Sequence, residues 1–128
     1  MEKLDFEGLI TFTYYNDLEK ASEFYRDIMK LELVVDLSWS KIYKLGKNAH
    51  IGLVDAEHGH HKPSADKPVM LSFMVSDADK WYQYLNAKDI KTNHEPQESE
   101  SLHMKGFLTW DPEGYVIEIL EFLTKPYG

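Results

Sequence analysis

One carboxylate of this chain, Glu118, stands alone among apolar residues and is the first candidate for chemistry. Residues 116–120 read Val-Ile-Glu-Ile-Leu, so strand alternation puts Ile117 and Ile119 on one face of a strand and Glu118 on the other. A carboxylate that faces a cavity acts as an acid, a base or an anchor for a cation. On a solvated sheet face the same residue is only polar surface.

Two histidines are candidate partners for this carboxylate. His50 begins a short predicted strand next to a Gly-Lys-Asn turn, and His103 begins the strand predicted opposite Glu118 in a closing hairpin. An imidazole at either place is suited to proton transfer near neutral pH. The alternative for both is an exposed surface histidine.

A second group of histidines lies in the segment Asp-Ala-Glu-His-Gly-His-His at residues 55–61. His58 with His61, or His60 with Glu57, would supply ligands for a metal at the surface. The segment contains a glycine and matches no structural zinc spacing. We therefore interpret it as a solvated loop with adventitious affinity for metals.

Aromatic side chains alternate along two predicted strands. Phe12 and Tyr14 share one face of the first, and Trp39, Lys41 and Tyr43 share one face of the other. If both faces line a cavity, they form aromatic walls with one cationic group, which suits a planar or amphipathic small molecule. The alternative is that several of them pack beneath helices as core.

These candidates belong to a sequence unit that occurs twice. Ile-Thr-Phe-Thr-Tyr-Tyr-Asn-Asp at residues 10–17 and Met-Leu-Ser-Phe-Met-Val-Ser-Asp at residues 70–77 each lead into an amphipathic helix. Such a repeat indicates one duplicated supersecondary unit, and a ligand pocket commonly forms where two units meet. Asp17, and Ser76 or Asp77, are suitable N-caps for the two helices.

Each half is predicted to fold as β-α-β-β-β. The first comprises a strand at 9–15, a helix at 18–29 and strands at 32–35, 39–45 and 50–54. The second comprises a strand at 69–75, a helix at 78–85, a weak strand at 91–94 and a hairpin of 103–110 with 115–122. Together they make a single domain over residues 1–128, with module one at about 6–55, a linker at about 56–68 and module two at about 69–124.

Composition narrows the function classes. The chain has 128 residues, a formal net charge of −8 and no cysteine. It therefore lacks the basic surface that nucleic acid requires, and it has no thiol nucleophile, thiolate metal site or disulfide. A charged first segment and the lack of a long apolar run lead us to expect a cytoplasmic protein without a membrane partner.

The repeat, together with Asp-Pro-Glu-Gly-Tyr-Val-Ile-Glu-Ile at residues 111–119, resembles the vicinal oxygen chelate superfamily. This group includes glyoxalase I, bleomycin-resistance proteins, fosfomycin-resistance proteins and extradiol dioxygenases. The resemblance implies an α+β fold in which two βαβββ modules form a pseudo-symmetric curved mixed sheet around a central cavity. It also implies that Glu118 faces this cavity, and that the protein forms a homodimer.

The resemblance further implies where metal ligands would lie in the enzymes of the superfamily. The four equivalent positions are Ile10, Gly52, Met70 and Glu118, of which only Glu118 is a plausible ligand. One carboxylate is too few for a catalytic metal, so the standard site is dismantled. His50, which shares strand parity with Gly52, is a candidate replacement ligand or base.

Three functions follow as hypotheses. The first is a small-molecule binding protein, similar to the bleomycin-resistance branch, that needs no cofactor. The second is a lyase or isomerase of a small carbonyl compound, with Glu118 and His50 at a rearranged site that holds either a divalent metal or none. A third possibility is an accessory module that acts through an interface.

Overall fold

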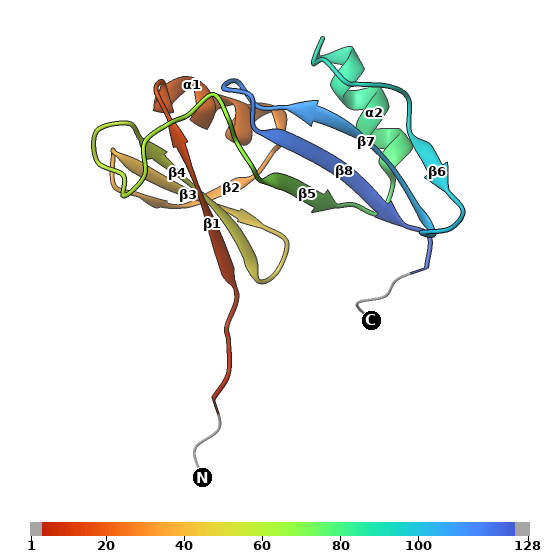
Figure 1. Cartoon of the computed structure of the whole chain (residues 1–128), viewed down its shortest axis with the longest axis horizontal. Helices are drawn as coiled ribbons and strands as arrows, with labels where there is room; N and C mark the ends of the chain where they lie inside the picture. The colour runs from red at the N-terminus through yellow and green to blue at the C-terminus, as the bar shows by residue number, and fades with distance from the viewer. Residues whose placement is uncertain (1–3, 125–128) are drawn as a thin grey trace. The chain divides into compact units, whose positions relative to one another are not determined.

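The computed structural model describes residues 4–124 and divides the chain into two compact units, Met1–Ser64 and Ala65–Gly128. Each unit is a βαβββ module with one four-stranded mixed sheet (Figure 1). The α+β fold of two such modules, which the repeat predicts, is confirmed. Within residues 4–124 no helix is long and apolar enough to cross a bilayer.

The first module contains β1 (Leu9–Tyr15), α1 (Leu18–Glu23), the π-helix η1 (Phe24–Ile28), β2 (Glu32–Asp36), β3 (Ser40–Leu45) and β4 (Ala49–Asp55). Its sheet has the order β1-β4-β3-β2, in which only β1 and β4 are parallel. The side chain of Asp17 accepts a hydrogen bond from the Lys20 amide at 3.1 Å and so caps α1, as the sequence predicts.

The second module contains β5 (Met70–Met74), α2 (Ala78–Ala87), β6 (Gln97–Ser99), β7 (Met104–Trp110) and β8 (Val116–Phe122). Its sheet repeats the topology of the first, with the order β5-β8-β7-β6 and β5 parallel to β8. Asp77 caps α2 by accepting from the Lys80 amide at 3.0 Å, which decides between the two candidate caps. The helix packs on β7 and β8 (Figure 1).

One face of each sheet packs against its own helix and forms the core. In the second module, the buried side chains on this face alternate along the strands, namely Leu71, Phe73, Phe107, Ile117 and Ile119. The residues between them point to the opposite face, which carries no helix of the module. We call this the open face of each module.

Two predicted elements differ from the observed ones. The strand that follows α2 is not at 91–94 but at Gln97–Ser99, while Thr92 makes only an isolated bridge to Thr109. The predicted helix at 18–29 is a short α-helix followed by a π-helix. In both places the hydrogen-bonding pattern of the backbone departs from what side-chain periodicity alone predicts.

Candidate functional site

A cleft of about 440 Å³ lies within the second module. The strand residues that line it include Met70, Met104, Leu108, Glu118 and Leu120, all of which belong to the open face. The segment between α2 and β7 adds further lining residues, which are Asn93, His94, Gln97, Glu98, Ser99 and Leu102. An apolar floor with a few polar groups at the wall is typical of a small-molecule site.

Glu118 is the carboxylate of this cleft. It lies between Ser72 of β5 and Leu108 of β7 in the sheet register. The Ser72 hydroxyl donates a hydrogen bond of 2.6 Å to its Oε1. No group in residues 4–124 pairs with its Oε2, so that oxygen is available to a ligand.

Contacts on the opposite face of β8 fix the orientation of Glu118. Ile117 and Ile119 are fully buried beneath α2. Further along the strand, Glu121 Oε1 accepts a hydrogen bond from the Ala78 amide at 2.9 Å, at the start of the helix. Because successive side chains alternate, these anchors hold Glu118 toward the open face, as predicted from its sequence context.

Sequence reasoning missed Ser72 and His94 as residues of this site. Ser72 could have been found, since it is a polar residue at the same strand parity as Met70, between the apolar Leu71 and Phe73. His94 carries no comparable signal, because it lies in an irregular segment whose course depends on pairing with β7.

His103 does not take the place predicted for it. It precedes β7, has a positive φ of 54° and is exposed. Its carbonyl oxygen accepts a hydrogen bond from the Leu123 amide at 2.8 Å, so its backbone holds the end of the β7–β8 hairpin. The cleft is lined instead by its neighbours, Leu102 and Met104.

The first module carries the other predicted residues. Ile10, Phe12 and Tyr14 lie on its open face, and the β1–β4 register pairs Ile10 with His50 and Phe12 with Gly52. His50 therefore shares a face with Gly52, as predicted. A Cβ atom on Gly52 would lie 2.5 Å from both Cδ1 and Cε1 of Phe12, so the Phe12 ring covers this glycine.

Lys41 and Tyr43 do not lie on the open face with Phe12 and Tyr14, which decides between the two alternatives left open for them. Both residues lie on the helix face of β3, opposite Leu53 and Ile51 of β4. Tyr43 is fully buried, and its hydroxyl donates to the Ser22 carbonyl oxygen at 3.2 Å. Lys41 forms an ion pair of 3.4 Å with Asp36. Tyr43 is therefore core beneath α1 and not a cavity wall.

Trp39 precedes β3 and contacts the histidine-containing loop. Its ring stacks on His58 with 5.5 Å between the ring centroids and an interplanar angle of 26°. On the same loop, His61 makes an edge contact with Tyr14 at 5.5 Å. Two of the predicted aromatic residues therefore pack against loop histidines, which makes this loop a folded structure.

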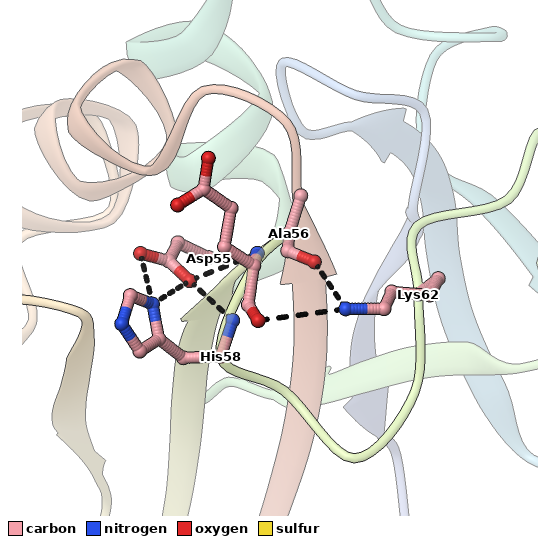
Figure 2. Close-up of polar contacts among 5 residues, drawn as sticks. Asp55, Ala56, His58 and Lys62 are labelled. Atoms are coloured by element: carbon pink, nitrogen blue, oxygen red, sulfur yellow. Dashed lines mark hydrogen bonds and ion pairs between the residues drawn. The ribbon is translucent and has the colours of Figure 1, made fainter.

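Polar contacts within the loop explain its order (Figure 2). Asp55 Oδ1 accepts from the His58 amide at 2.9 Å and lies 2.8 Å from His58 Nδ1, while Lys62 Nζ donates to the Ala56 carbonyl oxygen at 2.9 Å. Desolvation acts to raise the pKa of Asp55, but the hydrogen bonds from the ring and amide of His58 and from the Glu57 amide outweigh it. The pKa of Asp55 consequently lies below its ordinary value.

The metal site implied by the superfamily does not fit the residues present. Ile10 and Met70 have no suitable donor for a divalent cation, and Gly52 is covered by an aromatic ring. Across residues 4–124, no group of three or more histidine, aspartate or glutamate side chains is placed to hold a metal ion. We therefore derive no chemical step through a metal.

Solved structures with the same fold support this architecture. Lactoylglutathione lyase from Agrobacterium tumefaciens superposes with a TM-score of 0.72 at 24% identity, covering 88% of this chain and 91% of that one. A glyoxalase/bleomycin resistance protein/dioxygenase from Nocardioides superposes with a TM-score of 0.75 at 20% identity, covering 100% and 91% of the two chains. At these identities the likeness shows the fold alone.

Sequence comparison assigns the family. Uncharacterized protein YraH of Bacillus subtilis (strain 168) is 27% identical over 118 residues, which cover 84% of this chain and 92% of that protein. The sequence pattern of a superfamily matches residues 10–119, which cover most of both modules and include Glu118. The chain therefore belongs to the Glyoxalase/Bleomycin resistance protein/Dioxygenase superfamily.

Proposed function

We propose that this chain binds a small organic molecule in the cleft of the second module, with Glu118 as the polar anchor and without the standard divalent metal. The observation that carries the proposal is the carboxylate itself. One oxygen of Glu118 accepts from Ser72, and the other meets no partner in residues 4–124. A volume of about 440 Å³ is within the range of small-molecule sites.

The lining favours a ligand that donates hydrogen bonds. Glu98 and Glu118 are hydrogen-bond acceptors, and no lysine or arginine occurs among the lining residues of the described cleft. The net charge of −8 adds a long-range attraction for cations. Met70, Leu108 and Leu120 offer apolar contact, so we expect a ligand with an amine or similar donor on an apolar body.

The test is a set of primary amines that carry aromatic or aliphatic bodies, screened by the shifts of backbone amide resonances in ¹⁵N-labelled protein. We expect shifts within residues 93–99, 104–108 and 118–120. Glu118→Gln should lose them, because an amide replaces the anionic acceptor. Glu19→Gln, the same change on an exposed helical residue of the first module, is the matched control and should respond as wild type does.

Shifts confined to other surfaces, or equal binding by Glu118→Gln and wild type, would contradict the proposal. In either case the carboxylate would not be the anchor.

The second candidate function is a lyase or isomerase acting on a small carbonyl compound. Its support is the same unpartnered Oε2 of Glu118, since a carboxylate oxygen of this kind accepts a proton from a carbon next to a carbonyl. Hydroxyacetone incubated with the protein in D₂O provides the test. Loss of its C–H signals at a rate that falls in Glu118→Gln would favour the enzyme over the binding protein.

A further inference from the structure

The segment that carries His94 is fastened to the sheet just before that residue. The Asn93 amide donates to the Leu108 carbonyl oxygen at 3.0 Å, and Asn93 Oδ1 accepts from the Leu108 amide at 2.8 Å. The Thr109 hydroxyl donates to the Lys91 carbonyl oxygen at 2.7 Å. These bonds tie residues 91–93 to β7 and position His94 at the wall of the cleft.

The tautomer of the neutral His94 ring follows from the hydrogen bond that the ring makes. Its Nδ1 lies 2.7 Å from the carbonyl oxygen of Glu95. A carbonyl oxygen only accepts, so Nδ1 must carry the hydrogen. In the neutral imidazole the lone pair is then on Nε2, and no group in residues 4–124 bonds to that nitrogen.

We propose that His94 is a ligand-recognition residue whose Nε2 accepts an N–H or O–H from the molecule in the cleft. The inference rests on the proposed function and makes its ligand class narrower. With acceptors at Glu118, Glu98 and His94, the cleft suits a molecule that has at least two hydrogen-bond donors on an apolar body. Selection comes from the bond to Glu95, because it restrains the ring and fixes which nitrogen accepts.

The first test measures the ring itself and needs no ligand. Two-bond ¹H–¹⁵N correlation spectra of protein with ¹⁵N-labelled histidine distinguish protonated from unprotonated ring nitrogens. The His94 signals are identified by their loss in His94→Asn. A neutral ring protonated at Nδ1 supports the inference, and one protonated at Nε2 overturns it.

The second test uses benzamidine, a planar aromatic molecule with several N–H donors, and acetophenone, which has the same ring and no such donor. His94→Asn keeps a donor where Nδ1 was, near the Glu95 carbonyl, but has no acceptor in place of Nε2. His94→Gln places a carbonyl oxygen near the position of Nε2. His103→Asn, at an exposed histidine outside the cleft lining, is the control.

We expect benzamidine to bind more tightly than acetophenone and to shift the Nε2 resonance. His94→Asn should weaken benzamidine binding by about threefold to tenfold, which corresponds to one hydrogen bond. His94→Gln should recover part of this loss, and His103→Asn should lose nothing.

Equal affinity of wild type and His94→Asn for benzamidine, with cleft resonances shifting in both, would overturn this inference and leave the proposed function standing. If benzamidine shifts the cleft resonances but no primary amine shows binding that is lost in Glu118→Gln, the proposed function would be overturned. The ¹H–¹⁵N correlation spectra would in that case still show which ring nitrogen of His94 carries the hydrogen.

Discussion

The Ser72 hydroxyl and the Glu118 carboxylate form a hydrogen bond of 2.6 Å between two parallel strands that are far apart in the sequence. The bond holds one carboxylate oxygen and so restrains the rotation of a carboxylate that lines the cleft. Ser72 is exposed, so the bond contributes little to folding and much to the geometry of the site.

Removal of the hydroxyl should therefore affect binding more than stability. For Ser72→Ala we expect a free energy of unfolding within about 0.5 kcal/mol of wild type, as is usual for exposed positions. The affinity for benzamidine should fall by about twofold to tenfold, because the carboxylate loses its orientation. Urea denaturation and an NMR titration measure the two quantities. A large loss of stability at unchanged affinity would contradict this role.

Removal of the buried hydroxyl of Tyr43 should affect stability more than binding. Tyr43→Phe leaves the Ser22 carbonyl and hydroxyl without this partner in the core, which we expect to cost about 1–3 kcal/mol of unfolding free energy. Amine binding in the second module should not change. A double-mutant cycle with Ser22→Ala isolates the side-chain contribution, and a coupling energy near zero would show that the contact is unimportant.

The histidine-containing loop provides a prediction about pH. Because the pKa of Asp55 is lowered in the folded chain, the ionised residue stabilises the fold above its ordinary pKa of 3.8. This contribution is lost as pH falls through the folded value. The difference in unfolding free energy between wild type and Asp55→Asn should therefore be full at pH 6 and shrink below about pH 4. Thermal unfolding of both proteins across this range measures it.

A difference that stays constant down to pH 2.5 would mean that the carboxylate gains nothing from its bonds to His58. His58→Gln is the companion variant, since it keeps the backbone amide bond and removes the ring.

Metal content is the remaining prediction. We expect tag-free protein to carry less than one equivalent of zinc, nickel, iron or manganese, with any bound metal lost on deletion of residues 58–61 and retained in Glu118→Ala. Elemental analysis of the three proteins measures this. One equivalent that disappears only in Glu118→Ala would contradict this expectation and show a metal site at Glu118.

Much of the fold could be predicted because the sequence repeats its own pattern. The strand at residues 9–15 has the predicted bounds, and the alternation around Glu118 gave its face correctly. Around Glu118 the apolar Ile117 and Ile119 are buried on the helix face, so the local pattern and the packing agree.

The failures occur where a local pattern is ambiguous. Each face of β3 carries a lysine beside an apolar or aromatic residue, with Lys41 and Tyr43 on one face and Ile42 and Lys44 on the other, so alternation cannot say which face meets the helix. The edge strand β6 is short and polar, and its pairing depends on backbone groups of β7. The wall of the cleft, including His94, follows from that pairing.

The covered glycine of the first module marks a division of roles between the two modules. Phe12 pairs with Gly52 in one module as Ser72 pairs with Glu118 in the other, at the same place in the duplicated topology. In the first module the position serves packing, because the Phe12 ring lies where a side chain on Gly52 would be. The other copy holds a polar pair that the core does not need. Substitutions at Ser72 and Glu118 should therefore change ligand preference and leave the packing of Phe12 on Gly52 in the first module intact.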